Sequence, residues 1–110
     1  MRPATPLRIL CLAGDGIGPE IMSATCAVLD AVADLLDRPI DLSHAVIGFD
    51  ALAEEGSTIP DAVIKSARAA EGVILGPVYH NDYPPVADGG LNPSGVLRKE
   101  LTLFANVRPA

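Results

Sequence analysis

The chain has 110 residues, of which 49% are hydrophobic, and its 14 acidic and 8 basic side chains give a net charge of -6 at pH 7. This composition is typical of a globular domain, and a chain of this length can bury one modest core. Binding nucleic acid requires a concentrated basic face, and here the basic residues are scattered through an acidic chain, so no nucleic-acid partner is expected. A small anionic ligand is compatible with this charge, because two arginines placed together can outweigh a weak overall field.

The spacing of the two cysteines, Cys11 and Cys26, matches no zinc or redox motif. We expect both to be small buried residues of a protein in a reducing compartment. The apolar run at residues 7–13 is too short to cross a bilayer, and Asp15 follows it instead of a cleavage site of small residues. The sequence therefore predicts a cytoplasmic protein with no membrane partner.

Strand-like and helix-like patterns alternate in the first half of the chain. Residues 7–13 form a short apolar run closed by glycines, as in a strand buried on both faces. Residues 19–36 repeat apolar side chains with a period of about 3.6, which predicts a helix. A second strand is predicted over residues 40–49, and residues 49–56 are typical of a short helical turn ended by Gly56.

The alternation continues through the middle of the chain. Residues 60–70 carry apolar side chains on one helical face, and we expect Ser57 or Thr58 to cap this helix. Residues 72–78 are a compact apolar run, typical of another buried strand. Strands and helices in this order predict an α/β fold with a mostly parallel sheet and flanking helices.

The last third begins with an irregular segment. Residues 79–90 show little periodicity, and a loop of this length usually either binds something or is mobile. Asn92 is suited to cap a helix that starts at Pro93. Residues 103–107, just before Arg108, are expected to form a further short strand.

The segment AGDGIGPE, residues 13–20, follows the first predicted strand and opens the first predicted helix. Glycines in such a turn can let the phosphates of a dinucleotide reach the helix amides. Here the glycines at 14, 16 and 18 have a different spacing, and the carboxylate of Glu20 close behind them would repel pyrophosphate. The segment is therefore not the usual dinucleotide motif, and a turn without any ligand is an equally good interpretation of it.

The two histidines and their acidic neighbours give no sign of a metal site. His44 lies in a predicted strand, which favours a structural role, and His80 lies in the irregular segment, where a solvated residue is the simpler interpretation. Asp82 and Asp88 do not have the spacing of a calcium loop. We assign no catalytic role to any of these residues.

Arg98 and Arg108 are stronger candidates for ligand binding. Arg98 lies on the helix predicted from Asn92, and Arg108 follows a predicted strand, so the two could approach a ligand from different elements. A guanidinium group binds a carboxylate in a bidentate geometry that lysine cannot copy. Two arginines therefore indicate a ligand with at least two carboxylates, and the alternative is that each pairs with a nearby Asp or Glu.

Three blocks, GDGIGPEI, GSTIPDAVIKSARAAEGVILGPV and LRKELTLFANVRPA, occur in this order over nearly the whole chain. Together they resemble the amino-terminal third of the isocitrate and 3-isopropylmalate dehydrogenase family, the β-decarboxylating dehydrogenases. The resemblance implies that family's own α/β fold, which is not a Rossmann fold. Residues 1–110 would then be an incomplete amino-terminal part of the large domain.

The resemblance also implies an activity, the oxidative decarboxylation of a 2-hydroxy acid with NAD, or NADP, and Mg²⁺ or Mn²⁺. In such enzymes hydride leaves the hydroxyl-bearing carbon, the resulting oxoacid loses carbon dioxide, and the metal stabilises the enolate. The last block is more like the isopropylmalate and homoisocitrate enzymes than the bacterial isocitrate enzymes, and 3-isopropylmalate, a substrate of leucine biosynthesis, is the substrate we expect. Alternatives within the family are the isocitrate, homoisocitrate and tartrate or malate-type enzymes. If the chain truly ends at Ala110, a further alternative is a non-catalytic remnant that binds a dicarboxylate or a partner.

Site roles implied by the resemblance fall on two groups of residues. Arg98 and Arg108 match the arginines that bind the substrate carboxylates, and Asn92 and Ser94 fall where the family binds the variable group of the substrate. This polar pair favours a substrate with a polar substituent, so the identity of the substrate is not decided by the resemblance. The resemblance also implies cofactor-binding positions. Ile17 matches a residue near the adenine part of the cofactor, and Gly76, Pro77 and Val78 match a strand end near its nicotinamide.

Relatives of this kind are several times longer than this chain. Their third substrate arginine, catalytic tyrosine and lysine, and metal-binding aspartates belong to later segments, and Tyr79 and Tyr83 do not match that tyrosine. The resemblance thus implies no catalytic or metal-binding residue in this chain, which we expect to be inactive by itself, and a homodimer for the full-length enzyme. We also expect the exposed edge of an unfinished sheet to favour aggregation.

Overall fold

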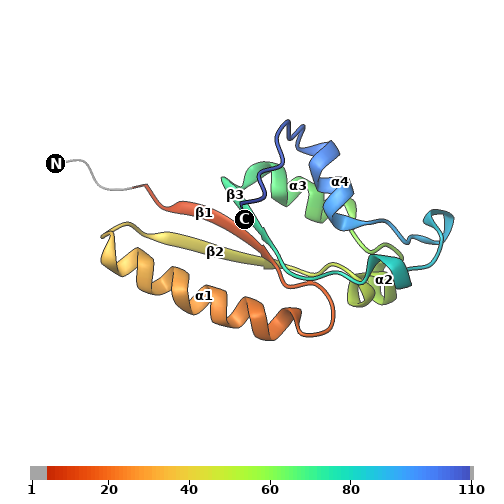
Figure 1. The fold of residues 1–110 in the computed structure, drawn as a ribbon, viewed down its shortest axis with the longest axis horizontal. Helices are drawn as coiled ribbons and strands as arrows, with labels where there is room; N and C mark the ends of the chain where they lie inside the picture. Colours follow the sequence, from red (N-terminus) through yellow and green to blue (C-terminus); the bar gives the residue numbers. More distant parts are fainter. Residues whose placement is uncertain (1–4, 110) are drawn as a thin grey trace.

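A computed structural model describes residues 5–109 of the chain. Its centre is a parallel sheet of three strands in the order β2-β1-β3 (Figure 1). The strands are β1 (Leu7–Leu12), β2 (Ile40–Ala45) and β3 (Gly72–Leu75). β1 pairs along its whole length with β2, from Leu7 opposite Ile40 to Leu12 opposite Ala45, and it pairs with β3 from Ile9 opposite Gly72 to Leu12 opposite Leu75. The predicted α/β class and the parallel sheet are confirmed.

Helices connect the parallel strands and cover both faces of the sheet. The link from β1 to β2 is α1 (Gly18–Leu35), and the link from β2 to β3 contains α2 (Phe49–Glu55) and α3 (Asp61–Ala69). After β3, two short 3₁₀ turns, η1 (His80–Asp82) and η2 (Val86–Asp88), lead to α4 (Pro93–Glu100). α1 lies along one side of the sheet, and α3 and α4 lie on the other (Figure 1).

The hydrophobic core is concentrated on the side of α3 and α4. Leu10 and Leu12 of β1 are almost fully buried there, packed with side chains from α3, α4 and the segments around α2: Ile47, Ile59, Val63, Ile64, Ala67 and Leu97. Burial of this apolar surface is the main force that holds the sheet to these helices.

On the other side of the sheet, α1 forms almost as predicted, but its apolar stripe stays largely uncovered. Only Gly18 and Met22 of this helix are buried, whereas Val28 is 62% exposed and Leu35 is 83% exposed. Length accounts for the exposure at the end of α1, since a helix of 18 residues spans about 27 Å and a strand of six residues about 20 Å. The last turns of α1 therefore extend beyond the sheet.

Several predicted boundaries are corrected by backbone features. The second strand ends at Ala45 instead of residue 49, before Gly48 takes a φ of 78° that no strand adopts. The third strand ends at Leu75 instead of residue 78. The strand predicted over residues 103–107 does not form; these side chains are exposed, and no strand of the described residues pairs with them.

Two of the three predicted helix signals are confirmed. Gly56 ends α2 in the left-handed conformation with a φ of 77°, and the side-chain oxygen of Asn92 caps α4 by accepting the Ser94 N–H at 3.2 Å. The cap predicted for α3 is wrong, because Pro60 occupies that position without a side-chain hydrogen bond. Thr58 is instead fully buried beneath the segment before α4, where its hydroxyl donates to the Leu91 carbonyl at 2.6 Å and accepts the Leu91 N–H at 2.9 Å.

Within residues 5–109, no helix is both long and apolar enough to cross a membrane.

Candidate functional site

The carboxyl ends of the three parallel strands meet at one edge of the sheet, which is where ligands bind in open α/β folds. Two chain segments leave the sheet there, residues 13–17 after β1 and residues 76–79 after β3. They are tied to each other through the backbone, since the Asp15 N–H donates to the Pro77 carbonyl at 2.8 Å and the Gly76 N–H donates to the Leu12 carbonyl at 2.7 Å. This edge is the candidate functional site.

The glycines of this edge are required by close backbone packing. A Cβ on Gly14 would lie 2.1 Å from the Pro77 carbonyl oxygen, and a Cβ on Gly18 or Gly76 would lie 1.9 or 2.0 Å from the Ala13 carbonyl oxygen. The space that these glycines leave is thus filled by the protein's own backbone and is not an open cradle for phosphate. This packing gives the glycines a structural reason that needs no phosphate.

Asp15, in the middle of this glycine-rich turn, is the central polar residue of the edge. It is only 6% exposed, and its carboxylate accepts the Phe49 N–H at 2.8 Å and the Tyr79 N–H at 3.1 Å. The Tyr83 hydroxyl donates to the same carboxylate. One buried carboxylate therefore joins the turn after β1, the start of α2 and the segment after β3.

Asp15 was not among the site residues predicted from the sequence. The signal that could have found it is a charged residue directly after a strand buried on both faces, because such a residue needs several donors.

Tyr83 supplies one of these donors from the irregular segment. Burial, together with its hydrogen bond to Asp15, raises the pKa of the Tyr83 hydroxyl above its ordinary value. Its ring also packs edge-on against Phe49, with the ring centroids 5.0 Å apart. At neutral pH Tyr83 is therefore a protonated donor that helps to fix the Asp15 carboxylate.

The residues predicted to bind a cofactor lie at this edge. Ile17 is 58% exposed at the end of the glycine-rich turn. Gly76, Pro77 and Val78 are half-buried and directly follow β3, and the backbone bonds described above hold the two segments side by side. An exposed isoleucine next to a fixed backbone segment suits the flat apolar face of a nucleotide base, and the assignment stays a prediction.

The residues predicted to bind substrate lie mainly on α4. Asn92 and Ser94 are half-buried at its start, and Arg98 is exposed in its last turn. Ser94 and Arg98 are four residues apart and therefore lie on the same face of the helix. Arg108 does not follow a strand as predicted; it is exposed in a segment without regular structure, where its Nε–H donates to the Asn106 side chain at 3.2 Å.

The alternative that these arginines serve in ion pairs finds no support within residues 5–109. The one ion pair there joins Arg68 of α3 to Glu100 of α4 at the surface. Arg98 and Arg108 are thus not engaged in ion pairs there, no contact joins them to each other, and their role in binding an anionic ligand stays a prediction.

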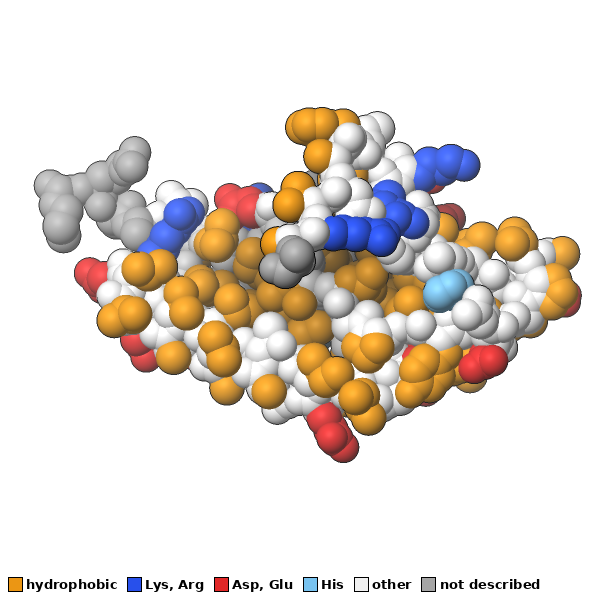
Figure 2. Space-filling model, in the orientation of Figure 1, with side chains coloured by type: hydrophobic (Ala, Val, Ile, Leu, Met, Phe, Trp, Pro, Cys, Tyr) orange, Lys and Arg blue, Asp and Glu red, His pale blue; other side chains and the backbone are white. Residues whose placement is uncertain are grey.

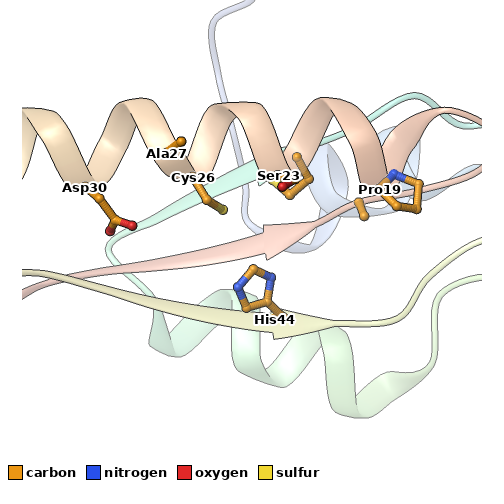
Figure 3. Close-up of a pocket in the computed structure, with 8 residues that line it drawn as sticks. Pro19, Ser23, Cys26, Ala27, Asp30 and His44 are labelled. Atoms are coloured by element: carbon orange, nitrogen blue, oxygen red, sulfur yellow. The ribbon is translucent and has the colours of Figure 1, made fainter.

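The described part of the chain contains no group of three His, Cys, Asp or Glu side chains that could hold a metal ion. It does contain an open pocket of about 500 Å³ between α1 and β2 (Figure 3). Cys26 and Asp30 of α1 and His44 of β2 contribute to its wall. The cysteine is half-buried, not fully buried as predicted, and His44 is an exposed strand residue.

Comparison with known proteins places this architecture in a family. The sequence model described as isocitrate/isopropylmalate dehydrogenase matches residues 8–110. The chain belongs to this family.

Individual relatives agree with the assignment to the isocitrate/isopropylmalate dehydrogenase family. A 3-isopropylmalate dehydrogenase of Streptococcus thermophilus (strain CNRZ 1066) is 41% identical over 106 residues, which are 93% of this chain and 30% of that protein. A 3-isopropylmalate dehydrogenase of Nitratidesulfovibrio vulgaris is also 41% identical over 106 residues, 94% of this chain and 30% of that protein. The chain thus spans about 30% of the length of the curated relatives that it matches.

A solved structure of this family has the same fold. The β-decarboxylating dehydrogenase of Thermococcus kodakarensis, in its apo form, superimposes with a TM-score of 0.69 and 30% sequence identity over 88% of this chain and 27% of that protein. The fold expected from the resemblance is therefore confirmed.

Proposed function

We propose that this chain is the amino-terminal part of an NAD-dependent oxidoreductase that oxidises and decarboxylates 3-isopropylmalate. The observation that carries the proposal is the 41% identity to 3-isopropylmalate dehydrogenases over nearly the whole chain. Because the chain spans about 30% of those proteins, the activity is proposed for a protein that also carries the segments beyond it. We propose a homodimer in the cytoplasm for that protein.

In this proposal Arg98 and Arg108 bind the two carboxylates of the malate portion of the substrate. Both guanidinium groups are exposed and take part in no ion pair within the described residues. Each can form a bidentate pair with a carboxylate, which fixes the orientation of the substrate as well as its position. Asn92 and Ser94 sit four to six residues before Arg98 and would contact the substituent that differs between substrates.

The cofactor would lie at the edge where the strands end, with Ile17 against its adenine part and residues 76–78 near its nicotinamide. When bound, NAD accepts the hydride that leaves the hydroxyl-bearing carbon of the substrate. The described residues do not form a Mg²⁺ or Mn²⁺ site, so we assign no step of this chain to a metal. What this chain supplies is binding and orientation.

Isocitrate, homoisocitrate and tartrate remain the alternative substrates, because Asn92 and Ser94 are polar. The Asn92 side-chain oxygen is already engaged in capping α4, which leaves its NH₂ group and the Ser94 hydroxyl as the polar groups available to a substituent. Steady-state reduction of NAD by the full-length protein with Mg²⁺ and either 3-isopropylmalate or one of these three acids decides between the four substrates. Failure with all four would refute the dehydrogenase proposal.

Replacing one substrate arginine tests the assigned roles. We expect Arg98→Ala to lower kcat/KM by about 10²-fold to 10³-fold, because charge-assisted hydrogen bonds to a carboxylate are lost. Arg68→Ala is the matched control, since Arg68 is an exposed arginine paired with Glu100 and should leave kcat/KM nearly unchanged. Equal effects of the two substitutions would remove the substrate role from Arg98.

A further inference from the structure

The two cysteines of the chain lie against each other across the interface between sheet and helix. Cys11 is in β1 and Cys26 is in α1, and their Sγ atoms are 4.0 Å apart. The two residues differ sharply in accessibility, since Cys11 is completely buried and Cys26 is half-buried. Among the described residues, the chain thus places one accessible thiol directly over one inaccessible thiol.

The accessible thiol opens into the pocket of about 500 Å³ between α1 and β2. Figure 3 shows Cys26 on the face of α1 that is turned toward β2, with His44 of β2 on the opposite wall. Ser23 and Asp30, one turn to either side of Cys26 on α1, place a hydroxyl and a carboxylate near it in a pocket wall that mixes polar and apolar side chains. A small polar oxidant can therefore reach the sulfur of Cys26, whereas Cys11 lies behind it.

We propose that Cys26 and Cys11 form an oxidant-sensitive thiol pair, in which a hydroperoxide oxidises Cys26 from the pocket and Cys11 then closes a disulfide. In the first step the Cys26 sulfur attacks the peroxide, whose O–O bond breaks, and the products are the sulfenic acid of Cys26 and water or an alcohol. In the second step the Cys11 sulfur attacks the Cys26 sulfur and displaces its hydroxyl group. That group leaves as water with the proton of the Cys11 thiol, so two thiols are oxidised and one peroxide is reduced.

The order of the two steps follows from the surroundings of the sulfurs. Burial, with Cys26 beside it, raises the pKa of the Cys11 thiol to about 11, so this thiol keeps its proton at neutral pH. Cys11 therefore stays inert until an electrophilic sulfur is formed next to it.

Disulfide formation requires only a small movement. The sulfurs must approach from 4.0 Å to about 2.0 Å. α1 can follow such a movement, since Gly18 and Met22 are its only buried residues. The product would join β1 to α1 around the turn of residues 13–17, so that both sides of the glycine-rich turn become covalently linked.

Peptide mapping tests the proposal in the native protein. Glu20 is the only glutamate between the two cysteines, so cleavage after glutamate separates them unless a disulfide holds the peptides together. After treatment with hydrogen peroxide we expect these two peptides to remain joined, with a combined mass about 2 Da below the sum of the reduced forms, and to separate on reduction.

Two substitutions complete the experiment. Cys11→Ala should leave Cys26 as a sulfenic acid that a sulfenic-acid probe captures, or carry it on to the sulfinic acid, about 32 Da heavier. Cys26→Ala, in the more accessible position, should leave Cys11 unmodified by the same treatment. Three outcomes would each overturn the proposal. The peptides could stay unlinked after peroxide treatment, the link could join Cys26 residues of two chains, or Cys11 could be oxidised in Cys26→Ala.

Discussion

Asp15 is the residue that couples the separate segments of the strand-end edge. Its carboxylate accepts hydrogen bonds from the backbone of Phe49 and Tyr79 and from the Tyr83 hydroxyl, while its own N–H is bound to Pro77. Desolvation of a buried carboxylate is unfavourable, and the hydrogen bonds from these donors offset it only if all of them form. Removal of the carboxylate should therefore harm folding more than loss of a surface charge.

Replacement of Asp15 by alanine gives the first test at this scale. We expect Asp15→Ala to lower the free energy of unfolding by about 2 to 4 kcal/mol, because two partly buried N–H groups and one hydroxyl lose their acceptor. Urea denaturation monitored by circular dichroism measures the loss. The exposed Asp34 of α1 is the control, and Asp34→Ala should change stability by less than about 0.5 kcal/mol. If both variants lose the same stability, Asp15 does not have the proposed role.

The raised pKa of Tyr83 predicts a specific pH dependence. At high pH the unfolded chain releases the tyrosine proton at about pH 10, whereas the folded chain keeps it to a higher pH. The contribution of Tyr83 to stability is therefore complete below about pH 10 and declines as the pH rises further. Solvent partly screens this half-buried pair, so we expect the effect to stay below about 1 kcal/mol.

Tyr83→Phe makes this dependence measurable. The variant should lose less stability than the wild type between about pH 9 and pH 11, in urea titrations at each pH. Tyr79 is present in both proteins, so its contribution cancels in the comparison. Parallel stability curves for the two proteins would show that the Tyr83 hydroxyl does not sense its Asp15 partner.

The residue scale also shows where sequence reasoning stops. Asn92 could be predicted as a cap because its partner, Ser94, is two residues away. The partners of Asp15 could not be predicted, because Phe49 and Tyr83 follow 34 and 68 residues later and only the fold brings them together. The exposure of Arg98 and Arg108 is now established, but their convergence on one ligand is still a prediction.

At the scale of elements, the boundaries set by local chemistry were predictable and those set by distant partners were not. Gly56 and Asn92 end and begin helices through bonds within a few residues, and both were predicted correctly. The strand expected at residues 103–107 has suitable side chains, but a strand exists only when another strand pairs with it. Thr58 was misassigned as a cap for the same reason, because its partner Leu91 is 33 residues away.

The buried hydroxyl of Thr58 supports a prediction at this scale. Thr58→Val keeps the shape of the side chain but leaves the N–H and carbonyl of Leu91 without their partner, so we expect a loss of about 1 to 3 kcal/mol in unfolding free energy. Thr58→Ser retains the hydroxyl and should recover most of the hydrogen-bond contribution. Thermal unfolding of the two variants distinguishes them, and equal stability would mean that the hydrogen bonds contribute nothing.

At the scale of the whole molecule, one side of the sheet is well covered and the other is not. Core residues fill the side of α3 and α4, whereas hydrophobic side chains on α1 and in the last segment remain exposed, and Figure 2 shows such side chains over most of the face in view. β2 and β3 also have no strand on their outer sides within the described residues. Exposed apolar surface and open sheet edges both favour self-association.

We therefore predict that the isolated 110-residue chain self-associates in a concentration-dependent way. Sedimentation velocity at increasing protein concentration measures this association. Leu35→Lys combined with Leu36→Lys should reduce it, since these residues are 83% and 67% exposed at the end of α1. A chain that stays monomeric at all concentrations would contradict the prediction, and an unchanged association of the double variant would assign it to the sheet edges.

The close backbone approaches at Gly14, Gly18 and Gly76 have a mechanical consequence. Because carbonyl oxygens fill the space beside these glycines, the turn after β1 cannot slide past the segment after β3 without a clash. Any opening or closing of the protein around a ligand must move residues 13–18 and 76–79 as one rigid body. A hinge would then be found outside these two segments, in connections that carry no such interlock.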